Sequence, residues 1–192
     1  MKNLFSIYLL ILSLSVCMGQ MQSVQKEVDS IVKSIDTQYN LWKKDSSNLR
    51  KSNHKFKCVQ LELTGNVQYI YKDTQLQYIK TSVQSKEEYN YQEFFLENGS
   101  LKYYISQVKV VVIDPKTKDK KIILKIHRYY FRSQQLILCL HKEAEGTPAN
   151  VVAKLNATEE VKVKGNKDML LRTIDELILK DKPYAIQKYY CD

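Results

Sequence analysis

Three stretches of the chain repeat one pattern of hydrophobic and polar positions. They read YIYKDTQLQYI (69–79), FFLENGSLKYY (94–104) and YYFRSQQLILC (129–139). In each stretch, two runs of aromatic and aliphatic residues flank a polar pair, and a leucine follows this pair at the same distance. Apolar residues that alternate with a period of two are typical of strands with one buried face. Each stretch therefore predicts a β-hairpin.

The polar pairs predict two-residue turns. Asn-Gly at 98–99 carries the strongest signal, because both central residues of a type I′ turn need positive φ. Asp-Thr at 73–74 and Ser-Gln at 133–134 occupy the same position in the other two stretches. We therefore expect three hairpins of one design.

A two-residue turn also predicts which residues face one another. It places Leu96 opposite Leu101 and Phe94 opposite Tyr103. It likewise sets Phe131 opposite Leu136 and Tyr129 opposite Leu138. The predicted aromatic face comprises Tyr69, Tyr71, Leu76, Tyr78, Phe94, Leu96, Leu101, Tyr103, Tyr129, Phe131, Leu136 and Leu138.

The aromatic face has two interpretations. It is either the core beneath the helices or an open platform that binds a ligand. We favour the core, since a sheet with one apolar face needs a cover. Lys102, Arg128 and Arg132 then fall on the outer face, and we predict that they contact an anionic partner.

Further strands and two helices complete the predicted fold. Strands are expected at 57–63, where Gly65-Asn66 follows, and at 108–114 and 120–126 on either side of a Pro- and Lys-rich turn. Helical spacing of apolar residues predicts helices over 24–39 and 166–183. Either helix is able to cover the aromatic face. Within 143–165, the stretch after the first loop fits a helix or a strand.

These elements predict an α+β fold. The expected core is an antiparallel meander sheet of about seven strands, built from repeated hairpins and packed with an N-terminal and a C-terminal helix. Residues 20–192 form one expected domain. It divides into a helix and linker (20–50), the hairpin sheet (55–142) and a loop with the C-terminal helix (143–192).

The N-terminal residues have the pattern of a secretory signal. Lys2 precedes an apolar run of 13 residues, Leu4 to Val16, which is shorter than the roughly 20 residues of a membrane span. Cleavage after Gly19 leaves a mature chain without a later apolar segment long enough to span. Lipidation at Cys17 in LSVC, or an uncleaved anchor, is the alternative. We expect a secreted or periplasmic protein.

Charge and cysteine content fit this location. The net charge of +9 falls to +8 once Lys2 is removed and favours an anionic envelope component or another protein as partner. Export argues against nucleic acid. Cys58, Cys139 and Cys191 predict one disulfide and one free thiol. In an open meander we expect no Cys58–Cys139 bond, a buried Cys139 and a reactive Cys191.

Residues with catalytic potential follow no known motif. No nucleophile elbow, zinc-protease, Walker or Rossmann pattern is present in the sequence. The expected register places His127 near Leu140, so that His141 points to the opposite face and a shared metal site is not formed. The carboxylate pairs at 87–88 and 175–176 read as solvated charges. We predict no catalytic, cofactor-binding or metal-binding residues.

The hairpin pattern, Y-Y-F-x-x-x-x-L, resembles exported proteins of unknown function from Bacteroidetes-like bacteria. RYYFRSQQLI (128–137) and EFFLENGSLKYY (93–104) carry the resemblance, which covers residues 20–142. It implies secretion and an α+β fold, and it supplies no activity. We expect an exported, non-enzymatic protein that binds a ligand or macromolecule. The alternatives are a secreted hydrolase with dispersed carboxylates and a structural protein that assembles through a sheet edge.

Overall fold

The computed structural model describes residues 2–45 and 49–192, and its side chains over 23–44 and 49–192. The chain forms two compact units, Met1–Asn40 and Leu41–Asp192. The first belongs to one long helix, α1 (Lys2–Asp45), which includes the predicted helix 24–39. The predicted signal peptide (1–19), which includes Cys17, belongs to the segment whose side chains are not described. Within the residues whose side chains are described, none of the helical segments has the length and hydrophobicity that spanning a bilayer requires.

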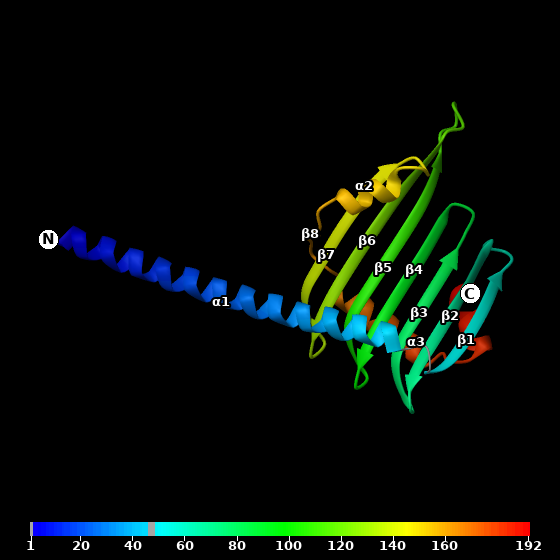
Figure 1. Cartoon of the computed structure of the whole chain (residues 1–192), viewed down its shortest axis with the longest axis horizontal. Coiled ribbons are helices and arrows are strands. Elements are labelled where there is room, and N and C mark those ends of the chain that lie inside the picture. Colours follow the sequence, from blue (N-terminus) through cyan, green and yellow to red (C-terminus); the bar gives the residue numbers. More distant parts are fainter. Residues whose placement is uncertain (1, 46–48) are drawn as a thin grey trace. The chain divides into compact units, whose positions relative to one another are not determined.

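The second unit is built on an eight-stranded antiparallel sheet in which the strands lie in chain order (Figure 1). The strands are β1 (Arg50–Cys58), β2 (Leu63–Lys72), β3 (Gln75–Gln84), β4 (Glu88–Glu97), β5 (Ser100–Ile113), β6 (Lys120–Arg132), β7 (Gln135–Gly146) and β8 (Val161–Lys162). Three helices accompany them: α2 (Val151–Ala157), α3 (Lys167–Ile178) and α4 (Pro183–Cys191). The predicted α+β meander is confirmed.

All three predicted hairpin turns are present. Residues 73–74, 98–99 and 133–134 connect β2 to β3, β4 to β5 and β6 to β7. Asn98 and Gly99 have φ of 51° and 74°, as a type I′ turn requires. Ser133 and Gln134 reach 48° and 63° without a glycine. The repeated pattern therefore specified the turns even where the turn residues are poor formers.

A β-bulge recurs at the same place in each of the three hairpins that the repeated pattern predicted. The third residue after each turn is left without a partner, and these residues are Gln77, Lys102 and Ile137. Leu96 pairs with Leu101 as predicted, but Phe95, not Phe94, pairs with Tyr103. Because strand side chains alternate, one extra residue moves everything beyond it to the other face.

The bulges correct the predicted aromatic face. Phe94 pairs with Tyr104, and Tyr129 pairs with Cys139. Three predicted members lie on the opposite face, and these are Tyr78, Tyr103 and Leu138. Their places on the aromatic face are taken by the next residue along each strand, and these residues are Ile79, Tyr104 and Cys139. All three are buried.

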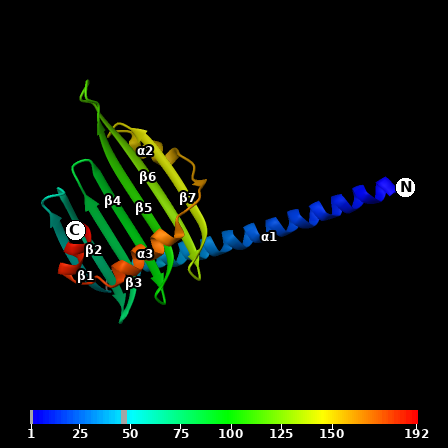
Figure 2. The ribbon, with the colours of Figure 1, turned by 180° about the vertical axis from the view of Figure 1, so that it is seen from behind.

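The core interpretation of the aromatic face is confirmed. We call this side of the sheet the α3 face, because α3 runs across the strands there (Figure 2). The other side, where α2 packs on β6 and β7, is the α2 face. The core on the α3 face consists of Phe56, Cys58, Val67, Tyr69, Ile79, Phe94, Leu96, Leu101, Tyr104, Phe131, Leu170, Ile174, Leu177 and Ile186.

The predicted strand at 57–63 is wrong. Residues 59–62 form the turn between β1 and β2, and Val59 and Leu61 are 77% and 54% exposed. Gly65 does not make a turn but lies inside β2, opposite Phe56. A Cβ at Gly65 would clash with Cζ of Phe56, so the ring occupies the space that glycine leaves.

The C-terminal part contains more structure than the pattern predicted. The undecided segment holds both α2 and the short strand β8. The predicted helix 166–183 corresponds to α3, whose first turn is capped by the Asn166 side chain accepting from the Met169 N–H at 3.1 Å. Pro183 does not simply follow a helix but begins α4, since proline fits the first turn of a helix.

One disulfide joins β1 to α4. Cys58 and Cys191 are bonded with their Cα atoms 5.2 Å apart, whereas Cys139 is a free, buried thiol. The expected count of one bond and one free thiol is confirmed, and so is the expectation that Cys58 does not pair with Cys139. The predicted reactivity of Cys191 is wrong, because α4 brings it back to β1. The bond is consistent with an oxidising, extracytoplasmic compartment.

Candidate functional site

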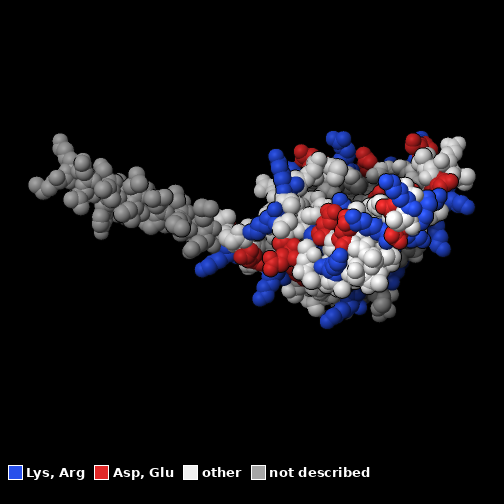
Figure 3. Space-filling view, turned by 90° about the horizontal axis from the view of Figure 1, so that it is seen from above, with Lys and Arg blue, Asp and Glu red and all other residues white. Residues whose placement is uncertain are grey.

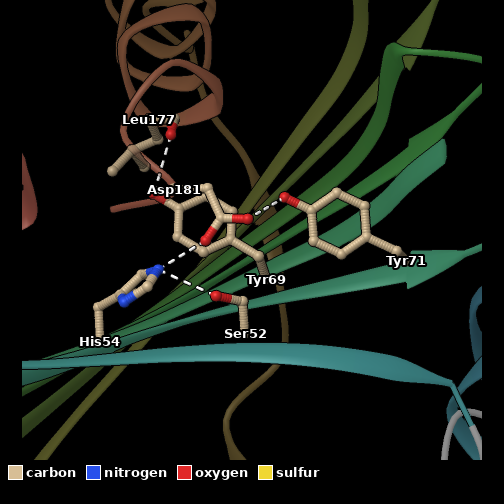
Figure 4. A network of polar contacts seen from close by, with 6 residues as sticks. All are labelled: Ser52, His54, Tyr69, Tyr71, Leu177 and Asp181. Atoms are coloured by element: carbon tan, nitrogen blue, oxygen red, sulfur yellow. Dashed lines mark hydrogen bonds and ion pairs between the residues drawn. The ribbon is translucent and has the colours of Figure 1, made fainter. Parts of the chain in front are cut away.

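A polar network connects β1 and β2 to the loop between α3 and α4 (Figure 4). Asp181 in this loop accepts a hydrogen bond from the Tyr71 hydroxyl through Oδ2. Its Oδ1 lies 2.6 Å from Nε2 of His54, and Oγ of Ser52 lies 3.0 Å from the same nitrogen. Serine, histidine and aspartate are thus in contact, which raises the question of a catalytic triad.

The geometry differs from that of a triad. There, aspartate binds one imidazole nitrogen and serine the other, so that histidine can take the serine proton. Here Ser52 and Asp181 share Nε2 of His54. The His54 side chain is also buried and offers little access to a substrate. This network is therefore a structural tether and not a nucleophilic site.

The electrostatics of the tether support this role. Burial would raise the pKa of Asp181, but hydrogen bonds from Tyr71, His54 and Ser52 outweigh it and hold the pKa below its ordinary value. Burial, and then the bond to Asp181, raises the pKa of Tyr71. Beside them the Tyr69 hydroxyl donates to the Leu177 carbonyl at 2.9 Å, near the end of α3. The loop is thus fixed to the sheet by a charged hydrogen-bonded centre.

A second carboxylate, and this one is buried, lies on the α2 face. The Glu93 side chain is 2% exposed, accepts from the Tyr91 hydroxyl, and lies 3.7 Å from Nζ of Lys43 and 4.0 Å from Nζ of Lys80. Burial lowers the pKa of Lys80. Next to them Trp42, in the last turn of α1, stacks on Tyr78 at 4.2 Å between ring centroids. Glu93 is neutralised by its partners and anchors this turn.

A surface hollow lies between β2, β3, β4 and α4 on the α3 face. We call it the α4 hollow, and its lining consists of Leu63, Val83, Ser85, Glu88, Asn90, Gln92 and Tyr190. Tyr190 stacks on Phe56 with 4.4 Å between ring centroids, and Thr81 donates to Oε1 of Gln92 at 3.2 Å. Oδ1 of Asn90 is buried and has no hydrogen-bond partner. The hollow therefore combines apolar, aromatic and amide groups with one unsatisfied acceptor.

The two histidines of β6 and β7 form a cross-strand pair. His127 pairs directly with His141, and their ring centroids are 4.3 Å apart. The prediction that they point to opposite faces is wrong, because the bulge at Ile137 shifts the register by one residue. Within the described part of the chain, no group of three or more His, Cys, Asp or Glu residues is arranged to hold a metal ion.

The three basic residues predicted to contact a partner are not brought together as one patch. Lys102 is the bulge residue of the second hairpin and pairs with Glu97 at 3.2 Å. Arg128 is partly buried and pairs with Glu160 at 2.5 Å. Arg132 is exposed at the end of β6. On the side drawn in Figure 3, lysine and arginine side chains are spread out with Asp and Glu among them.

Sequence reasoning missed both the α4 hollow and the Asp181 tether. Asp181 meets His54 from 127 positions away in the chain, and α4 was not predicted. The histidine pair was detectable, since both residues lie on the same predicted hairpin. Comparisons with protein-family models, curated proteins and solved structures give no match to this chain.

Proposed function

We propose that the protein is an exported, non-enzymatic binding protein that takes a hydroxyl-rich small ligand, such as a sugar, in the α4 hollow. The observation that carries this proposal is the unpaired, buried carboxamide oxygen of Asn90 in the lining of the hollow. A buried acceptor without a partner costs about 1–3 kcal/mol. A ligand hydroxyl that donates to Oδ1 would recover this free energy on binding.

The rest of the lining fits the same class of ligand. Sugar rings combine an apolar C–H face, which packs on an aromatic ring, with hydroxyls that need donors and acceptors. Tyr190 supplies the ring, and Leu63 and Val83 supply apolar contact. Glu88 and the Gln92 amide supply polar groups, whereas the Ser85 hydroxyl is bonded to the backbone of Glu87 and Glu88. Because Thr81 donates to Oε1 of Gln92, and Tyr104 also hydrogen-bonds with this side chain, the Gln92 amide is oriented before a ligand arrives.

The residue types of the hollow favour binding over hydrolysis. Glycoside hydrolysis generally requires two carboxyl groups that flank the scissile bond. Glu88 is the carboxylate among the residues that line the hollow, and the carboxylates of Asp181 and Glu93 are engaged in their own networks. The disulfide supports a location outside the reducing cytosol. These features support a carrier or receptor for a polar ligand.

The test compares two asparagines. Asn90 and Asn66 each have a buried Oδ1 without a partner, but only Asn90 is in the lining of the hollow. A panel of mono- and oligosaccharides is titrated into the full chain and followed by ligand-observed NMR and calorimetry. We expect saturable binding by at least one member, a loss of about tenfold or more in Asn90→Ala, and no change in Asn66→Ala.

Three outcomes would contradict the proposal. The first is the absence of saturable binding across the panel. The second is equal affinity in Asn90→Ala and the wild type. The third is turnover of a bound sugar that is abolished in Glu88→Gln, which would favour the hydrolase alternative.

A further inference from the structure

The α3 face of β6 and β7 carries a ladder of directly opposed side chains. From the 133–134 turn upward the pairs are Phe131 with Leu136, Tyr129 with Cys139, His127 with His141, and Lys125 with Glu143. The apolar and aromatic part belongs to the core beneath α3, and the polar part follows it along the same two strands. The first two pairs of the ladder therefore consist of packing side chains, and the next two consist of side chains with polar or metal-coordinating groups.

The histidine pair is placed on a rigid support. Both residues lie inside long, paired strands, and their imidazole centroids are 4.3 Å apart with 30° between the ring planes. The His141 side chain is 21% exposed, and His127 is partly exposed. Nδ1 of His141 has no hydrogen-bond partner. This nitrogen is buried, so the protein leaves one ring nitrogen of the pair unsatisfied.

A carboxylate and an ammonium group border the pair. Oε2 of Glu143 lies 3.6 Å from Nε2 of His141 and 3.2 Å from Nζ of Lys125. Glu143 is thus shared between an imidazole and a lysine. Cys139, one pair below, is not available as a soft ligand, because its side chain is buried in the core.

We propose that His127 and His141 bind a divalent late transition metal ion, with Cu²⁺ the tightest, and that Lys125 restrains the site by holding Glu143. Neutral imidazole is the commonest protein ligand for these metals, and two imidazoles on neighbouring strands form a chelate. Water completes the coordination, because among the described residues no third His, Cys, Asp or Glu is in place as a ligand. Mg²⁺ and Ca²⁺, which prefer oxygen ligands, are excluded.

Variants of Lys125 and Glu143 should change the metal affinity in opposite directions. Its ammonium group repels a bound cation and pairs with Glu143 at 3.2 Å. Lys125→Ala removes this positive charge and frees the carboxylate to become a third ligand, so metal affinity should rise. Glu143→Gln removes the carboxylate charge, so affinity should fall. A merely structural role of the ladder would not move the affinity in opposite directions.

The experiment titrates Cu²⁺, Ni²⁺ and Zn²⁺ into the full chain without a polyhistidine tag. Calorimetry measures affinity, and electron paramagnetic resonance of the Cu²⁺ complex detects nitrogen ligands. We expect one site with nitrogen coupling, lost in His127→Ala and in His141→Ala. The matched control is Lys142→Ala, which changes the neighbour of His141 on the α2 face. We expect Lys142→Ala to bind as the wild type does, and Lys125→Ala to bind about tenfold more tightly.

The proposal would be overturned by wild-type affinity in either histidine variant or by a Cu²⁺ spectrum without nitrogen coupling. Weaker binding in Lys125→Ala would overturn the assigned role of Glu143. Urea unfolding of each variant verifies that the hairpin is folded. None of these readouts depends on a ligand in the α4 hollow.

Discussion

The disulfide between Cys58 and Cys191 should carry a large share of the stability of the fold. Its two residues are 133 positions apart in the sequence. Closing a loop of this length in the unfolded chain lowers its entropy, and the loop-closure relation gives about 5 kcal/mol at 25 °C. Domains of this size are stable by about 5–15 kcal/mol in total. Replacing both cysteines by alanine should therefore lower the free energy of unfolding by about 3–5 kcal/mol.

The variant should still fold, because other contacts hold α4 on β1. Ile186 is fully buried, and Tyr190 stacks on Phe56. The Gln187 amide donates to the Lys57 carbonyl at 3.0 Å and its oxygen accepts from the Lys57 N–H at 3.4 Å. These contacts stay in place when the covalent bond is absent. The expected effect is thus a lower unfolding midpoint with native secondary structure.

Urea unfolding followed by circular dichroism measures this effect. The wild type is unfolded with and without a reductant, beside Cys58→Ala/Cys191→Ala and the control Cys139→Ala, which retains the bond. Reductant should shift the midpoint of the wild type and of the control but not that of the double variant. The unfolding slope should also rise without the bond, because the unfolded chain expands. An unchanged wild-type midpoint under reductant would refute the reasoning.

Three further predictions concern the core, the tether and one glycine. Phe131→Ala should lower the free energy of unfolding by about 3–5 kcal/mol in urea, because the ring is fully buried in the core. Asp181 has a pKa below its ordinary 3.8, so its carboxylate stabilises the fold above that pH, and the stability gap to Asp181→Asn should narrow as pH falls below about 4. Gly65→Ala should lower the thermal midpoint, and Gly65→Ala/Phe56→Leu should recover only part of the loss, since the added Cβ clashes with the Phe56 ring and also with the Ser82 carbonyl oxygen.

The local parts of the fold followed from the sequence. Alternating residues and turn pairs specify a hairpin within about ten positions, so the turns and the meander order were predicted. The bulges were not, because Gln77, Lys102 and Ile137 share no residue type. One uncounted residue in each hairpin was enough to misplace Tyr78 and to separate His127 from its partner.

The long-range parts had no local signal. The tether joins His54 to Asp181, and the disulfide joins Cys58 to Cys191, across more than a hundred positions in each case. Alternation was also misleading at the start of the sheet, where Val59 continues the pattern of a strand but lies exposed in a turn. The α4 hollow needs Tyr190 from the helix that the pattern did not predict.

The strict match between chain order and strand order has a consequence for biogenesis. Each strand pairs with the one made just before it, so the sheet can grow hairpin by hairpin as the chain emerges, without waiting for distant segments. The helices that cover the α3 face cannot dock while the strands are still being made, because α3 and α4 follow all eight strands in the chain. Until they dock, Tyr69, Phe94 and Phe131 are uncovered, and this interval is when a chaperone or an oxidase that forms the Cys58–Cys191 bond would act on the nascent protein.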